Sequence, residues 1–168
     1  PSNLTFMGRY TFWKSGIESI VIPETVEHFG MNDGAEATTA SNVWLFAECA
    51  NLTSVTLPSN LQTVGAYIFV NCSNLTTITY TGYTGSGNSL PESLTLIGDY
   101  MFSGCTSLKQ LSLPGVTVTG TRSFGAKETA SSNTAPIGPT VACAIESISL
   151  PSVTKFGDYL FKGCEYLT

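Results

Sequence analysis

Apolar and hydroxyl-bearing residues alternate in short segments along the whole chain, and most of these segments end at a proline. The segment 52–58, LTSVTLP, is typical, because side chains 54–57 alternate between hydroxyl-bearing and apolar types. An alternation with a period of two predicts a β-strand with one buried face. Segments of this kind predict five strands, at residues 17–22, 52–57, 75–80, 108–113 and 145–150.

The predicted strands belong to a repeat of 22 or 23 residues. Six or seven residues after the proline comes a glycine, and in the regular units a phenylalanine follows four residues later. A cysteine stands three residues after three of these phenylalanines, at Cys72, Cys105 and Cys164, and also after Phe46, at Cys49, where an insertion separates the phenylalanine from its glycine. A coil of this length cannot enclose its own apolar side chains, so successive coils must stack around a shared core. The sequence therefore predicts one domain over residues 1–168: a β-rich solenoid with one parallel sheet and little helix.

The repeated pattern resembles the BspA-like leucine-rich repeat family, whose units run apolar-Gly-x-x-x-Phe-x-x-Cys-x-x-Leu-x-x-apolar-x-apolar-Pro. The resemblance covers essentially the whole chain. We predict a right-handed coil, and because the sequence starts at Pro1 without an initiator methionine, we expect a fragment of a longer repeat protein. The resemblance also implies an adhesin-like protein that is extracellular or at the cell surface. Two units depart from the pattern: the first is one residue short and has no cysteine, and Gly125-Ala126-Lys127 stand where a cysteine is expected after Phe124.

The composition of the chain excludes several classes of partner and of chemical site. Charged residues make up only 11% of the chain and the net charge is −5, with the seven Lys and Arg scattered singly, so no nucleic acid is expected as a partner. No apolar run is long enough to span a membrane, and no signal peptide is visible. The five cysteines include no Cys-x-x-Cys pair and His28 is the only histidine, so we predict no metal site, no cofactor and structural cysteines.

The outward side chains of the predicted sheet form two columns of candidate ligand-binding residues on its concave face. The columns are Ser19, Ser54, Thr77, Gln110 and Ser147, and then Val21, Thr56, Thr79, Ser112 and Ser149. A solvated β-surface is the alternative, because strands tolerate Ser and Thr without any partner.

Three insertions break the period, at residues 31–42, 81–90 and 126–140, and offer a rival location for binding. Tyr83 in the second insertion is a candidate for stacking on a sugar or for anchoring a protein, and Trp13 and Trp44 are weaker candidates.

The predicted function is a non-catalytic extracellular binding module for a host protein, another cell surface or a glycan. A structural spacer in a surface protein is the alternative. A glycan-active enzyme is disfavoured, because the twelve carboxylates are spread over all coils without a repeated pair, and we predict no catalytic residue. Uncapped apolar ends predict end-to-end self-association.

Overall fold

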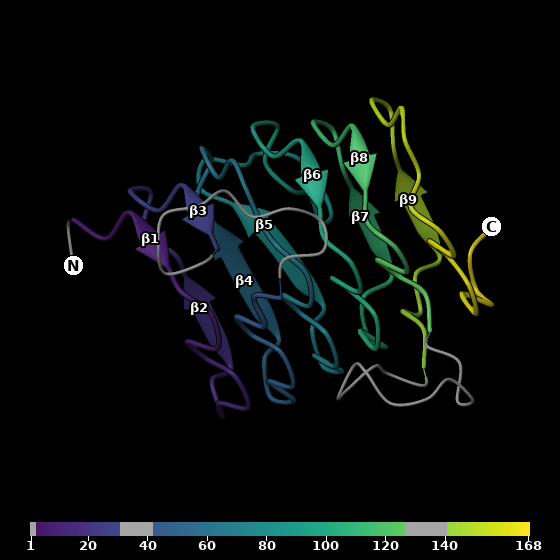
Figure 1. Ribbon diagram of the computed structural model, residues 1–168, viewed down its shortest axis with the longest axis horizontal. Helices are drawn as coiled ribbons and strands as arrows, with labels where there is room; N and C mark the ends of the chain where they lie inside the picture. Colours follow the sequence, from purple (N-terminus) through teal and green to yellow (C-terminus); the bar gives the residue numbers. More distant parts are fainter. Residues whose placement is uncertain (1–2, 31–41, 127–140) are drawn as a thin grey trace.

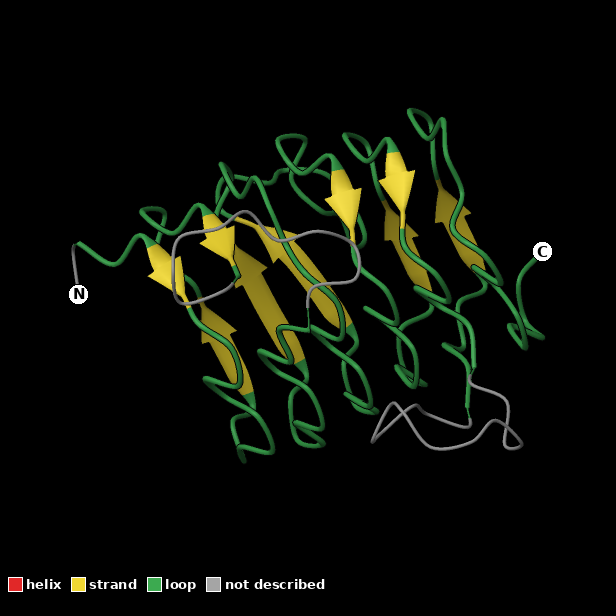
Figure 2. Ribbon diagram, in the orientation of Figure 1, coloured by secondary structure: helices red, strands yellow, loops and turns green. Residues whose placement is uncertain are grey.

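The computed structural model describes residues 3–30, 42–126 and 141–168, which wind into a stack of flat coils (Figure 1). Within these residues every regular element is a short strand, and none is a helix (Figure 2). The strands are β1 (Phe6–Met7), β2 (Ser19–Val21), β3 (His28–Phe29), β4 (Ser54–Leu57), β5 (Thr77–Tyr80), β6 (Leu96–Ile97), β7 (Gln110–Ser112), β8 (Val118–Thr119) and β9 (Ser147–Ser149). The predicted parallel-strand solenoid is confirmed.

The longer strands form the main row, β2, β4, β5, β7 and β9, which lies at all five predicted positions. Each strand is shorter than its predicted segment, because only the alternating part of the repeat pairs with its neighbours. Strand β4 pairs in parallel with β2 and with β5, and β7 pairs in parallel with β9. In β4 the burial alternates as predicted: Val55 and Leu57 are buried while Ser54 and Thr56 are partly exposed.

The prediction of a single parallel sheet is incomplete. The coils carry a second row of parallel strands on another side (Figure 1). Strand β1 pairs with β3, and β6 pairs with β8, all in parallel. Isolated bridges from His28 to Thr63 and from Val118 to Lys155 extend this row. Each strand of this second row is two residues long and comes just before the repeat glycine. The strands form because coils stacked in register bring equivalent backbone segments together.

A column of phenylalanine rings runs through the core and fixes the spacing of the coils. Neighbouring rings stack with centroids 5.2–5.7 Å apart. The column consists of Phe12, Phe46, Phe69, Phe102, Phe124 and Phe161. Stacked rings combine a large buried area with a specific contact, so this repeat position carries much of the coil-to-coil packing.

A second column consists of thiols that bond the preceding coil. The Sγ atom of Cys72 donates to the Phe46 carbonyl at 3.0 Å, and Cys105 Sγ donates to the Phe69 carbonyl at 3.2 Å. No cysteine stands three residues after Phe124, and Cys143, which follows the insertion, makes the equivalent backbone contact. Its amide donates to the Phe124 carbonyl at 2.8 Å, as the Cys105 amide donates to the Phe102 carbonyl.

The coils turn at side-chain-bearing residues in the left-handed backbone region, including Trp44, Tyr67 and Tyr100, with φ of 55°, 64° and 54°. Such a conformation costs about 1–2 kcal/mol at each residue that has a Cβ. The Tyr67 ring stacks on Trp44 at 4.2 Å and on Tyr100 at 5.1 Å, and these contacts offset the cost.

Candidate functional site

The predicted columns lie side by side on the exposed side of the main row, which we call the hydroxyl face. In the first column Ser54 pairs with Ser19 and with Thr77, and Gln110 pairs with Ser147. In the second column Thr56 pairs with Val21 and with Thr79, and Ser112 pairs with Ser149. The registers place all ten residues in the predicted columns. Val21 is the apolar exception and is 71% exposed.

Hydroxyl groups just before the strands bond the neighbouring coil. The Thr53 hydroxyl donates to the Glu18 carbonyl at 2.9 Å, and the Thr76 hydroxyl donates to the Thr53 carbonyl at 3.2 Å. Thr117 comes just before β8, and Thr154 comes just before the bridge residue Lys155. Their hydroxyls donate to the carbonyls of Thr95 and Thr117 in the preceding coils. These hydroxyls are structural.

Hydroxyl groups on the hydroxyl face have no such partner. Among the described residues, the side chains of Ser54, Ser112 and Ser149 make no hydrogen bond, although each carries a donor and an acceptor. The same holds for Ser19, Thr56, Thr79, Gln110 and Ser147. The hydrogen-bonding capacity of this face is therefore open to water or to a ligand.

The insertion 81–90 interrupts the main row, so neither column runs unbroken from β2 to β9. Asn88 and Ser89 lie between β5 and β7: the Ser89 amide donates to the Ile78 carbonyl at 3.0 Å, and the Ser112 amide donates to the Asn88 carbonyl at 2.9 Å. Ser89 pairs in parallel with Ser112. The short segment 88–90 thus acts as an extra half-strand.

The side chain of Asn88 supplies the other half of that strand. Its Oδ1 accepts a hydrogen bond from the Ile78 amide at 2.9 Å, and its Nδ2 donates to the carbonyls of Thr76 at 2.8 Å and Gln110 at 3.1 Å. One amide side chain therefore satisfies backbone groups of both flanking strands, which would otherwise lack partners. The sequence identified this stretch only as an insertion, and Asn88 was not among the candidate residues.

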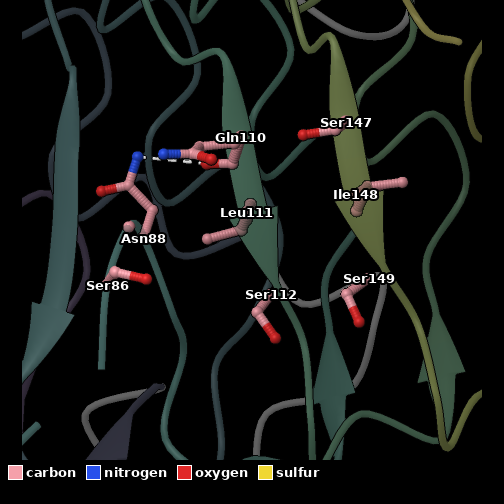
Figure 3. A pocket seen from close by; sticks show the side chains of 9 residues that line it. Ser86, Asn88, Gln110, Leu111, Ser112, Ser147, Ile148 and Ser149 are labelled. Atoms are coloured by element: carbon pink, nitrogen blue, oxygen red, sulfur yellow. Dashed lines mark hydrogen bonds between the residues drawn. The ribbon is translucent and has the colours of Figure 1, made fainter. Parts of the chain in front are cut away.

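The returning insertion forms one wall of a pocket on the hydroxyl face (Figure 3). The pocket has a volume of about 230 Å³, and its other walls come from β7 and β9. Its lining consists of Ser86, Gly87, Asn88, Gln110, Leu111, Ser112, Ser147, Ile148 and Ser149. In Figure 3 the hydroxyls of Ser112 and Ser149 lie on neighbouring strands and point the same way. The strands and the second insertion, predicted as rivals, meet at this pocket.

Gly87 lets the wall approach the strand. Its φ is +83°, and a Cβ at this position would lie 3.1 Å from Gln110 Nε2. A larger residue would strain the backbone and press on the Gln110 side chain.

The aromatic candidates lie apart from the pocket. The Tyr83 ring packs against Tyr80 with centroids 5.0 Å apart, and its hydroxyl donates to the Ser86 carbonyl at 3.1 Å. Tyr83 thus supports the wall from within the insertion. Trp44 is buried at 5% exposure, whereas Trp13 is 40% exposed beside Tyr10. The insertions 31–42 and 126–140 fall almost entirely outside the described residues.

The side chains of His28 and Asp99 have contacts that join neighbouring coils. His28 Nδ1 lies 3.0 Å from Thr63 Oγ1, and Asp99 Oδ1 accepts a hydrogen bond from the Thr121 amide at 2.8 Å. Burial raises the pKa of the Asp99 carboxyl. The described residues contain no cluster of three metal-binding side chains and no helix that could cross a membrane.

The cysteines are free thiols, all buried except the half-buried Cys164. Burial raises the pKa of Cys143 to about 12 and that of Cys164 to about 11, and it also raises the pKa of Cys72 and of Cys105. A thiol that stays protonated is a poor nucleophile, which supports a packing role for this column.

Comparisons with known proteins agree with this architecture. A family model described as BspA type leucine rich repeat region matches six copies, over residues 1–33 and 38–137. The last described coil, residues 141–168, lies outside the match but continues the same strands and phenylalanine column. A search of curated proteins gives no match.

Two solved structures are similar to the chain. A leucine rich cell surface protein from Faecalibacterium prausnitzii A2-165 matches with 26% identity and a TM-score of 0.56, over 98% of this chain and 42% of that one. A leucine-rich repeat protein from Bacteroides ovatus ATCC 8483 matches with 21% identity and a TM-score of 0.41, over 98% of this chain and 51% of that one. The chain therefore spans about half the length of these proteins or less. With its family match and its stacked coils of repeated glycine, phenylalanine and cysteine, the chain belongs to the BspA-type leucine-rich repeat family.

Proposed function

We propose that this chain is a non-catalytic binding module of a cell-surface protein, and that it contacts its partner through the hydroxyl face. The main support is the contrast between two kinds of hydroxyl group. Thr53 and Thr76 bond the neighbouring coil, whereas Ser54, Ser112 and Ser149 present free donors and acceptors. The surface location is supported by the Faecalibacterium prausnitzii protein, which is described as a cell surface protein.

The pocket between β7, β9 and the insertion is the favoured centre of this face. Asn88 holds the wall in place with three hydrogen bonds to backbone groups, so little ordering is required when a partner binds. The serine side chains of the pocket can adapt their hydrogen bonds to many partners, as serines do in antibody loops.

Binding to arrays of purified extracellular proteins and glycans tests the proposal. Thr77→Arg and Ser112→Arg place a bulky cation on the hydroxyl face, and we expect each to abolish the array signal of the unchanged protein. Thr95→Arg is the matched control, because Thr95 is exposed next to β6 in the second row. Retained binding by both face variants, with unchanged melting temperatures, would contradict the proposal.

A structural spacer is the second candidate, and the unbroken phenylalanine column favours it, because continuous packing through all described coils stiffens the stack. A spacer requires no ligand. Failure of the array to give any signal that depends on the hydroxyl face would favour this function.

End-to-end self-association also stays a proposal. Phe156, Tyr159 and Tyr166 in the last coil are 56–60% exposed, which is high for large apolar side chains. Sedimentation velocity of the chain and of a Phe156→Ser variant would test this, since association through that end should weaken in the variant. A concentration-independent monomer would contradict it.

A further inference from the structure

We infer that the pocket walled by Ser86, Gly87 and Asn88 is a subsite for one ring of a neutral carbohydrate. The inference rests on the proposed function, because it assigns a ligand class to the hydroxyl face. It concerns the strands β7 and β9, where the face changes from a flat surface to a partly enclosed site.

The lining of the pocket mixes polar and apolar groups and is uncharged. None of its nine residues is charged. The flanking charges belong to Lys109 and Glu146, which form an ion pair with each other at 3.2 Å. A charged ligand would lose hydration here without meeting an opposite charge, which is unfavourable. A neutral ligand avoids that cost.

The chemistry of the open side chains suits hydroxyl groups on the ligand. Ser112, Ser147 and Ser149 can each donate and accept, and the Gln110 amide can do both through different atoms. Each hydroxyl of a sugar also donates and accepts, so several registers of hydrogen bonding are available around one ring. None of these protein side chains has a competing partner among the described residues.

The pocket offers little to a protein anchor. Binding hot spots are enriched in Trp, Tyr and Arg, which need well-packed and desolvated pockets. Leu111 is 3% exposed, and the pocket contains no aromatic side chain. At about 230 Å³ the pocket is also smaller than typical sites for drug-sized ligands, which span roughly 300–1,000 Å³. These features favour a single sugar ring over a bulky side chain of a protein partner.

The four pocket side chains that have no hydrogen-bonding partner within the described residues lie at regular positions on two neighbouring strands. Gln110 pairs with Ser147 and Ser112 pairs with Ser149, with about 4.8 Å between neighbouring strands. A ring lying across β7 and β9 therefore meets polar groups on two sides, while the wall of the insertion covers a third. Contacts of this kind are weak one by one, so we expect a dissociation constant of about 1 mM for a short oligosaccharide. Multivalent display of such sites would raise the apparent affinity.

Nuclear magnetic resonance titration of the ¹⁵N-labelled chain tests the inference. The probes are the neutral trisaccharides maltotriose, mannotriose, galactotriose and chitotriose, with trigalacturonate as the charged counterpart. We expect at least one neutral probe to shift the amide signals of residues 110–112 and 147–149, with trigalacturonate causing no saturable shift. Gln110→Ala and Ser149→Ala should weaken that binding about tenfold each, whereas Thr95→Ala should leave it unchanged.

Three results would overturn the inference: no saturable shift with any neutral probe at roughly 10 mM, shifts located away from β7 and β9, or equal binding of trigalacturonate. The array experiment separates this failure from that of the proposed function. A protein ligand on the array that is lost with Ser112→Arg would leave the binding module intact while removing its carbohydrate specificity.

Discussion

The stacked interior of the coils and the hydroxyl face use the same repeat in opposite ways. In the interior each repeated side chain has a partner in a neighbouring coil: Phe69 stacks on Phe46 and Phe102, and Cys72 Sγ bonds the Phe46 carbonyl. On the hydroxyl face Ser112 and Ser149 are equally regular but make no hydrogen bond within the described residues. Regular repetition alone therefore does not distinguish a structural residue from one available for binding; its partners do.

The largest expected difference between the two regions is in stability. Phe69→Ala removes a fully buried ring from the middle of the column, and we expect it to lower the free energy of unfolding by about 3–5 kcal/mol. Thr79→Ala on the hydroxyl face should change it by less than about 0.5 kcal/mol. Urea denaturation measures both. Similar losses for the two variants would remove the distinction between interior and face.

Alkaline pH should destabilise the interior through several thiols at once. A thiol whose pKa is raised by folding keeps its proton in the folded state, while the unfolded chain loses it above the ordinary value of 9.0. The contribution of these thiols to stability is therefore constant below about pH 9 and falls as pH rises towards about 12, the pKa of Cys143 in the folded protein. Unfolding midpoints between pH 7 and pH 11 measure this.

The control for the pH prediction is Cys143→Ala, which removes one of the contributing thiols. Its midpoint should fall less steeply between pH 9 and pH 11 than that of the unchanged chain. Identical slopes would show that Cys143 does not contribute to the alkaline loss.

A single thiol should have a smaller effect at neutral pH. Cys72→Ala leaves a small void between coils and removes the hydrogen bond to the Phe46 carbonyl, and we expect a loss of about 1 kcal/mol. Binding through the hydroxyl face should be unchanged, because Cys72 is fully buried. Rapid labelling of Cys72 by a thiol reagent in the folded protein would contradict this account.

The smallest expected effect is the difference between two threonines of one coil, Thr53 and Thr56. Thr53→Val removes the hydroxyl that bonds the Glu18 carbonyl, and we expect a loss of about 0.5–1 kcal/mol. Thr56→Val removes a hydroxyl without a partner and should be neutral, since valine suits a strand. Equal melting temperatures of the two variants would show that the hydroxyls preceding the strands are not structural.

Much of the site could be predicted from the sequence, because the period of two assigns alternate side chains to one face. Tyr83 was predicted as a binding residue; its ring packs against Tyr80 of β5, and its hydroxyl donates to the Ser86 carbonyl within the insertion. The extra half-strand had one visible sign: Ser-Leu-Pro occurs at 89–91, 112–114 and 149–151, each time at the end of a strand-like segment. The motif Gly-x-Tyr-x-Phe, as at residues 65–69 and 98–102, likewise indicated where the coils turn. It did not predict the left-handed backbone at Tyr67 and Tyr100.

The sequence by itself determined the coil, its family and the alignment of the columns, because each of these depends on local periodicity repeated many times. Only the tertiary structure decided where the hydroxyl face is interrupted. The three hydrogen bonds of Asn88 reach backbone groups of Thr76, Ile78 and Gln110, which are 10 to 22 residues away along the chain. No local pattern specifies such contacts, since they exist only once the coils on both sides have stacked.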